Sequence, residues 1–412
     1  MRIKKLLRSL LPGIFLLGFN IGTGSVTAMA KAGADFGMSL LWTIFLSCLI
    51  TYFLINIYGK YTIITGETAL EAFKKHIHPA VGIFFIIALG VNVCGSVMGV
   101  MGIIADTCFE WSKAYINGGI QPVYFAIFFS ALVYILFLDG RTKYFQNALA
   151  IIVAVMSLSF LINFFISFPP PVEIAKGMVP SIPKISSDKT PFLVVASMVG
   201  TTVFSGLFII RTTLVKEAGW TLKDLKVQRN DAMFSAVMMF VISASVMAAA
   251  AGTLHASGIK LEKVSQMITL LEPLAGPFAV TIFAIGLIAA GVSSQFPNVL
   301  LVPWLLCDYE KKDRNMKLVR YRIIVLFVSL LGLVVPLFHA RPIIVMIASQ
   351  AFGALILPVT VLCIMYLGNK KKIMGNLAFP PLTNSFLSLI LIFSLIMSYL
   401  GYSGLLTTLK SI

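Results

Sequence analysis

Long apolar runs, separated by short polar segments, follow one another along this chain of 412 residues. A membrane-spanning helix needs about 20 predominantly apolar residues, and segments of that kind recur throughout. The pattern therefore predicts an all-α, multi-pass membrane protein that forms a single transmembrane domain over residues 1–412. We expect about eleven transmembrane helices, at residues 10–33, 38–59, 80–105, 121–139, 146–168, 191–213, 230–253, 277–300, 321–338, 343–367 and 382–404.

The first apolar run is interrupted by Asn20-Ile21-Gly22-Thr23-Gly24-Ser25. Glycine costs about 1 kcal/mol relative to alanine in a helix, and Ser, Thr and Asn offer the backbone competing hydrogen bonds. Backbone groups freed at membrane depth are tolerated only where protein or a water-filled cavity satisfies them. We therefore predict a helix broken at mid-membrane, and broken helices in transporters mark the substrate site. The predicted substrate-binding residues here are Asn20, Gly22, Thr23, Gly24 and Ser25.

The sixth apolar run contains a similar interruption, Met198-Val199-Gly200-Thr201-Thr202-Val203-Phe204-Ser205-Gly206. Matching breaks in two halves of a chain indicate an inverted-repeat transporter. The repeat would be five-plus-five, pairing residues of about 10–168 with 191–367 and leaving a peripheral helix at about 382–404. The alternative is a glycine kink in each helix that only eases packing. The predicted substrate-binding residues of this break are Gly200, Thr201, Thr202, Phe204, Ser205 and Gly206.

A few polar residues lie inside the other predicted spans. Ser293, Ser294 and Gln350 complete the predicted substrate site, and Asn92 and Ser96 are further candidates. For each of these side chains, hydrogen bonding between helices is the alternative role. All sixteen acids and all four histidines fall in loops or near the ends of spans, which leaves no proton relay at the midplane.

Lys31 and Arg211 are the cations nearest the membrane interior, and both are candidates for charged residues of the pathway. The alternative for each is that the long side chain reaches out to an interface.

The composition supports a membrane protein, because 58% of the residues are hydrophobic and only 12% are charged, against about 25% in soluble domains. The net charge of +16 comes from Lys and Arg in short loops, which argues for topology and against nucleic-acid binding. These residues are about three times as frequent in the segments that would be cytoplasmic if the N-terminus lies inside. We therefore expect a bacterial inner (plasma) membrane protein with a cytoplasmic N-terminus and an external C-terminus.

Other classes of function have little support in the sequence. No nucleophile–base pair is visible, so an enzyme is not expected, and no cofactor is predicted. The five cysteines are scattered, which predicts neither a disulfide framework nor a thiolate metal site. The N-terminus imitates a signal peptide, although the break fits a retained helix better. The expected partners are the lipid bilayer and a small solute or ion, with no obligate protein partner visible.

Several of these segments resemble the Nramp (natural resistance-associated macrophage protein) family of divalent metal transporters. Leu17-Gly18-Phe19, with the chain from the break to Trp42, resembles its first helix and turn. Residues 283–294 closely resemble its eighth helix, and Ser349-Gln350 with Leu357-Pro358 resemble its tenth. The resemblance implies the inverted five-plus-five fold shared with amino-acid and sodium-coupled transporters. It also implies secondary transport of a divalent cation such as Mn²⁺, Fe²⁺ or Mg²⁺ by alternating access.

The chain departs from this family at the residues that would bind metal. The first-helix motif Asp-Pro-Gly-Asn corresponds to Gly22-Thr23-Gly24-Ser25, and the sixth-helix motif Met-Pro-His corresponds to Phe204-Ser205-Gly206. A second histidine corresponds to Arg211 and a glutamine to Ile356. The resemblance thus leaves the metal ligands unknown in this chain.

A second hypothesis follows from local electrostatics. The N-terminal ends of the half-helices near Ser25 and Leu207 favour anions, and Lys31 and Arg211 would add positive charge. This predicts a carrier of a small anionic, zwitterionic or neutral organic solute such as an amino acid. A hydrated ion such as Mg²⁺, which keeps several waters, would also need few direct ligands. A non-transporting membrane receptor or scaffold is the remaining, less favoured class.

Overall fold

The computed structural model describes residues 13, 16, 18, 20–113, 115–139, 158, 161, 162, 165, 170–183, 191–267, 279–312 and 314–410. Within these residues the regular structure is entirely helical. Eight helical stretches of the described chain are long and apolar enough to cross a membrane, which confirms the all-α, multi-pass prediction. The predicted span at 146–168 lies almost wholly outside the described residues, so the total of eleven and the inverted repeat stay predictions.

The helices of the described chain follow the predicted apolar runs closely. The longer ones are α3 (Thr23–Phe36), α4 (Leu41–Thr65), α6 (Pro79–Ser112), α7 (Pro122–Asp139), α10 (Phe192–Thr202), α11 (Ser205–Glu217), α12 (Leu225–Ala250), α15 (Ala279–Glu310), α16 (Val319–Leu331), α18 (Pro342–Asn369) and α20 (Pro381–Lys410). Short helices connect them: α5 (Ala69–Ala72), α9 (Pro171–Gly177), α13 (Val264–Met267), α17 (Val334–Leu337), α19 (Lys371–Met374), the π-helices η1 (Phe73–Ile77) and η3 (Ala251–His255), and the 3-10 helices η2 (Leu222–Asp224) and η6 (Gly375–Leu377).

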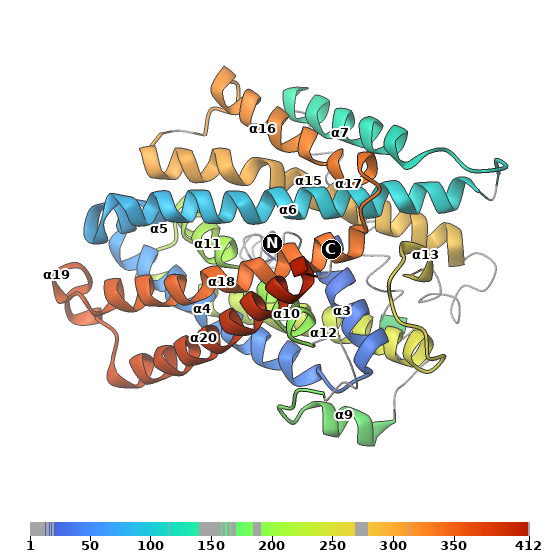
Figure 1. The fold of residues 1–412 in the computed structure, drawn as a ribbon. Coiled ribbons are helices and arrows are strands. Elements are labelled where there is room, and N and C mark those ends of the chain that lie inside the picture. The colour runs from blue at the N-terminus through green and yellow to red at the C-terminus, as the bar shows by residue number, and fades with distance from the viewer. Residues whose placement is uncertain are drawn as a thin grey trace, which may run out of the picture.

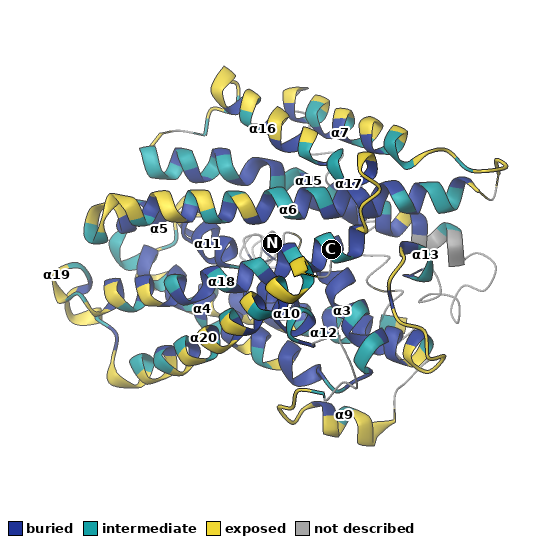
Figure 2. Ribbon diagram, viewed as in Figure 1, coloured by how far each residue is buried: buried dark blue, intermediate teal, exposed yellow. Residues whose placement is uncertain are grey.

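The long helix α6 runs through the molecule and packs against both α15 and α18 (Figure 1). Helices α7 and α16 cover α6 and α15 on one side, while α20 packs on α18 and α10 on the other. The short half-helices α3 and α10 lie inside this arrangement and contact each other, with α3 packed against α12 and α18 and α10 packed against α4 and α18. Burial follows the same plan, because the outer faces of α7, α16 and α20 are exposed and α3 and α10 are largely buried (Figure 2). The exposed faces are apolar, as a lipid-facing surface requires.

The first predicted break is present where the sequence places it. Residues 13, 16, 18 and 20 are helical, Ile21 and Gly22 leave the helix, and α3 restarts at Thr23. Gly22 is the N-cap with extended backbone angles and no side-chain cap, and its carbonyl accepts the Val26 N–H at 3.1 Å. The interruption predicted from glycine and hydroxyl residues is therefore a real break in the helix.

The second break separates α10 from α11 at Val203 and Phe204. Val203 has φ −100° and ψ 50°, and Phe204 is the extended N-cap of α11. Gly200 precedes this break and has a packing role. A Cβ at Gly200 would lie 1.9 Å from the backbone oxygen of Gln350, so α10 and α18 approach each other backbone to backbone.

Candidate substrate-binding cavity

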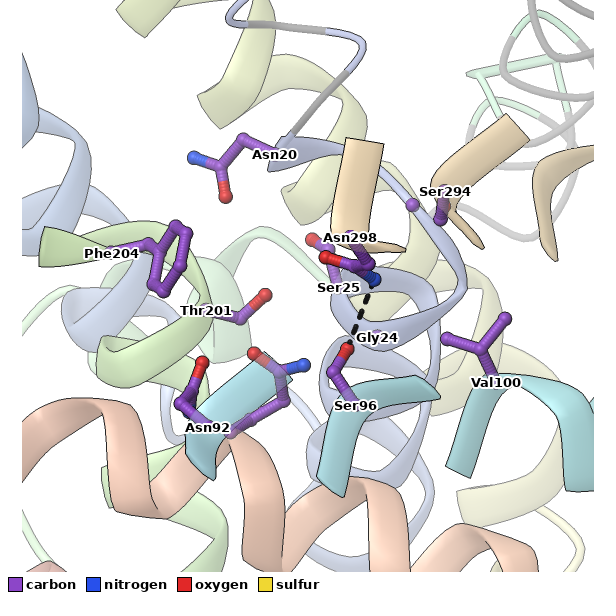
Figure 3. Close-up of a pocket in the computed structure, with 12 residues that line it drawn as sticks. Asn20, Gly24, Ser25, Asn92, Ser96, Val100, Thr201, Phe204, Ser294 and Asn298 are labelled. Carbon is purple, nitrogen blue, oxygen red and sulfur yellow. Dashed lines mark hydrogen bonds between the residues drawn. The ribbon is translucent and has the colours of Figure 1, made fainter. Parts of the chain in front are cut away.

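A cavity of about 40 Å³ lies where the two helix breaks meet (Figure 3). Its walls come from the first break, the second break and the three helices α6, α15 and α18. No charged side chain is among the described residues that line it. The lining consists mostly of amides, hydroxyls and glycine backbone: Asn20, Gly22, Gly24, Ser25, Asn92, Ser96, Val100, Thr201, Phe204, Ser294, Asn298 and Gln350.

Asn20 connects the two breaks directly. Its amide Nδ2 donates to the carbonyl of Thr202 at 3.2 Å and contacts the Met239 sulfur at 3.2 Å. The hydroxyl of Thr51 on α4 donates to the same Thr202 carbonyl at 2.9 Å. A helix end leaves carbonyls without intrahelical partners, and these two side chains satisfy one of them at the end of α10. The breaks are thus held together by a specific hydrogen-bonded contact.

Helices α6, α15 and α18 present a polar wall to the cavity. Asn298 donates to the Ser96 hydroxyl at 3.3 Å, the bond drawn in Figure 3. Asn92 donates to the Ser349 carbonyl at 2.7 Å, and the Ser349 hydroxyl returns a bond to the Asn92 carbonyl at 2.9 Å. These bonds between helices fix the orientation of the amides. Asn92 therefore has the alternative role, hydrogen bonding between helices, in addition to lining the cavity.

The predicted site residues divide into two groups in the structure. Those that line the cavity are Asn20, Gly22, Gly24, Ser25, Thr201, Phe204, Ser294 and Gln350. Those outside its lining are Thr23, Gly200, Thr202, Ser205, Gly206 and Ser293. In the second group, Ser205 accepts a hydrogen bond from Thr360 at 2.7 Å, and a Cβ at Gly206 would meet the Phe204 ring at 2.5 Å.

The two cations proposed for the pathway are both neutralised by carboxylates. Lys31 pairs with Asp35 one turn further along α3, with 2.6 Å between nitrogen and oxygen. Arg211 pairs with Asp231 of α12 at 2.5 Å, and both side chains are fully buried. The expectation that Lys31 and Arg211 add free positive charge is therefore wrong, and so is the alternative that Arg211 reaches an interface. Sequence reasoning placed Asp231 at the start of a span, whereas α12 begins at Leu225 and buries it.

Sequence reasoning missed three of the residues that shape this region: Thr51, Val100 and Asn298. A signal existed for Thr51, because Thr43, Ser47 and Thr51 recur every fourth residue in an otherwise apolar run, and all three are fully buried. Side chains with that spacing share one face of a helix. Asn298 follows Pro297 inside a long apolar helix. A polar side chain at such a position needs a hydrogen-bond partner, and this was a signal for Asn298.

A multi-pass membrane protein with two interrupted helices that meet at a polar cavity has the architecture of a transporter. The family model described as natural resistance-associated macrophage protein-like matches residues 14–403. The chain therefore belongs to the Nramp family, a family of integral membrane transporters, as the resemblance implied.

Individual relatives support the same assignment at low identity. The chain is 24% identical to the divalent metal cation transporter MntH of Caldanaerobacter subterraneus subsp. tengcongensis, over 92% of this chain and 89% of the relative. It is 23% identical to that of Clostridium acetobutylicum, over 98% of this chain and 93% of the relative. Among solved structures, an Eremococcus coleocola manganese transporter has a TM-score of 0.80 at 18% identity, covering 98% and 87% of the two chains. Inward-facing Mhp1 has a TM-score of 0.63 at 13% identity, covering 97% and 90%.

Proposed function

We propose that this chain is a secondary transporter that carries a divalent metal cation by alternating access, and that the cation keeps part of its water shell in the cavity. The observation that carries the proposal is the uncharged amide and hydroxyl lining of the cavity in a chain of the Nramp family. Relatives named as divalent metal cation transporters and a manganese transporter of the same fold support the choice of cargo.

The lining favours a hydrated ion over a bare one. A bare dication loses a large hydration energy that neutral oxygens recover poorly. Mg²⁺ dehydrates reluctantly and binds through few direct ligands, while carbonyl and water oxygens suit Mg²⁺, Ca²⁺ and Mn²⁺ better than softer metals. The cavity of about 40 Å³ has room for roughly three water-sized groups at 10–15 Å³ each. Side-chain oxygens of Asn20, Ser25 and Thr201 would then contact the cation or its waters.

The anionic or zwitterionic alternative has less support. Its electrostatic argument counted Lys31 and Arg211 as free positive charges in addition to the half-helix N-termini, and each of the two has a carboxylate partner.

The direction of insertion is proposed from the Lys and Arg distribution. We propose a plasma-membrane protein with the N-terminus in the cytoplasm and the C-terminus outside. The end of the molecule that carries α5 and α19 (Figure 1) would then face the cytoplasm.

Uptake into proteoliposomes tests this function. Wild-type protein is given Mg²⁺, Mn²⁺ or Ca²⁺ with a trapped indicator, and a panel of amino and carboxylic acids in parallel. We expect uptake of at least one divalent cation and none of the organic solutes. Uptake of an amino acid without any divalent cation would contradict the proposal.

A pair of glycine variants shows whether uptake depends on the break. A Cβ at Gly24 would lie 2.6 Å from the Gln350 amide nitrogen, whereas a Cβ at Gly18 meets nothing within 4 Å. We expect Gly24→Leu to abolish uptake and Gly18→Leu to retain it, with both proteins folded. Normal uptake by Gly24→Leu would show that transport does not depend on the cavity.

A further inference from the structure

The hydroxyl of Ser294 stands in the space that a side chain at position 22 would need. A Cβ built on Gly22 would lie 2.0 Å from the Ser294 Oγ and 2.9 Å from its Cβ. Both distances are shorter than real Cβ contacts, so a side chain at position 22 would require Ser294 to shift. Gly22 on the broken helix leaves the space, and Ser294 of α15 fills it.

Ser294 is oriented to present an oxygen to the cavity. Its hydroxyl donates to the Ala290 carbonyl one turn earlier, at 2.7 Å, which uses its proton and leaves acceptor lone pairs. The side chain is only 6% exposed and lines the cavity. Gln350 of α18 stands in the same relation to the other glycine of the break, since a Cβ at Gly24 would lie 2.6 Å from its Nε2. Scaffold helices thus supply side chains where the broken helix has none.

We propose that Ser294 is a specificity-determining residue for the transported cation, because its neutral oxygen occupies the place at the first break where residue 22 would otherwise project a side chain. The inference rests on the proposed function and refines it. An anionic oxygen at this place would favour direct coordination of a partly dehydrated ion. A neutral one leaves more of the water shell in place, so the site discriminates weakly between Mg²⁺ and Mn²⁺.

The first test removes only the oxygen. Ser294→Ala keeps the Cβ and should weaken the apparent affinity for the cation by about tenfold, the effect of losing one neutral ligand contact. Ser245→Ala is the matched control, because Ser245 is also buried and donates one turn back along α12, to Val241 at 2.7 Å, outside the cavity. Ser245→Ala should transport as the wild type does. Equal effects of the two substitutions, or none from Ser294→Ala, would overturn the inference.

The second test removes the Ser294 hydroxyl and supplies an oxygen from residue 22 instead. Gly22→Asp alone should lower the melting temperature, because its Cβ meets the Ser294 side chain. Adding Ser294→Gly frees the space and should restore the melting temperature. The double variant should bind Mn²⁺ at least tenfold more tightly than the wild type and prefer Mn²⁺ over Mg²⁺, as titration calorimetry with each metal would measure.

The outcomes separate this inference from the proposed function. A wild type that carries no divalent cation contradicts the function. The double variant then decides the inference by itself, and Mn²⁺ binding that requires both substitutions supports it. Mn²⁺ binding by Gly22→Asp alone, at wild-type stability, overturns the inference even if the wild type transports metal.

Discussion

Removing one partner of the buried ion pair between Arg211 and Asp231 should strongly destabilise the protein. The guanidinium Nη1 lies 2.5 Å from the carboxylate, and both side chains are fully buried. The other Asp231 oxygen accepts the Gly13 backbone N–H at 2.8 Å, while the second Arg211 nitrogen reaches the Gln228 carbonyl only at 3.4 Å. Among the residues that the structure describes, none accepts a hydrogen bond from the Arg211 Nε. Almost all the compensation for burying the guanidinium therefore comes from one carboxylate.

The expected magnitude follows from this dependence. Leaving one charge of a buried pair uncompensated costs about 3–5 kcal/mol, whereas replacing both partners with apolar residues is often close to neutral. We expect Asp231→Ala and Arg211→Met each to lose stability on that scale, and the double variant to recover most of it. The pair of Glu217, the last residue of the same helix, with Arg314 is the control, because the two lie 3.2 Å apart and the Glu217 side chain is 54% exposed, and a solvent-accessible pair contributes about 1 kcal/mol or less.

Thermal unfolding in detergent provides the measurement, with tryptophan fluorescence as the signal. Trp220 lies close to the pair, with its ring centre 5.1 Å from the Arg211 guanidinium carbon, so it reports on this region. The double-mutant cycle gives the coupling between the two residues. If Asp231→Ala shifts the melting temperature no more than Glu217→Ala does, the reasoning from burial and charge is refuted.

Two further predictions concern the end of the molecule that carries α5 and the contact between the breaks. Partial burial acts to raise the pKa of Glu67, but hydrogen bonds from Lys75 and His76 outweigh it and hold the pKa below its ordinary 4.5. This contribution to stability is complete above pH 4.5 and is lost as the pH falls through the lower folded-state pKa, so Glu67→Gln should flatten the acid side of a melting-temperature profile. A Glu67→Gln profile identical to that of the wild type would contradict this. Thr51→Val removes the hydroxyl that donates to the Thr202 carbonyl at 2.9 Å and should cost about 1 kcal/mol. Thr407→Val removes an exposed bond to the Ser403 carbonyl within α20, also at 2.9 Å, and should cost less in the same melting assay.

The positions of the helices and of both breaks could be predicted because the signals are local. Apolar runs of sufficient length define the spans, and Gly, Ser, Thr and Asn within them weaken the helix at the place where it breaks. The break at Ile21 and Gly22 and the end of α10 at Thr202 are decided by residues within one turn. Such features need no knowledge of what packs against them.

The partners of these residues could not be predicted from the chain alone. Asp231 lies 20 residues after Arg211, and their pairing depends on how α11 and α12 each pack against α4. The same holds for Ser294 and Gly22, which are far apart in sequence and share one small space. The electrostatic hypothesis lost part of its support for this reason, since it counted Lys31 and Arg211 as free charges without their carboxylates. The electric field of a charged residue can be judged from a sequence only when its ion-pair partners are known.

The neutral cavity and the buried ion pair are two aspects of one arrangement. Arg211, on the helix that follows the second break, is paired with Asp231, and neither residue is among the described residues that line the cavity. A binding site without net charge attracts a dication weakly, and it also releases one easily, which suits a carrier that must empty at each cycle. Selectivity in such a site has to come from how well fixed oxygens fit a water shell. In the proposed site, the orientation of Asn92 and Asn298 by bonds between helices would provide that fixed geometry, because neither amide can rotate toward an ion without giving up its partner.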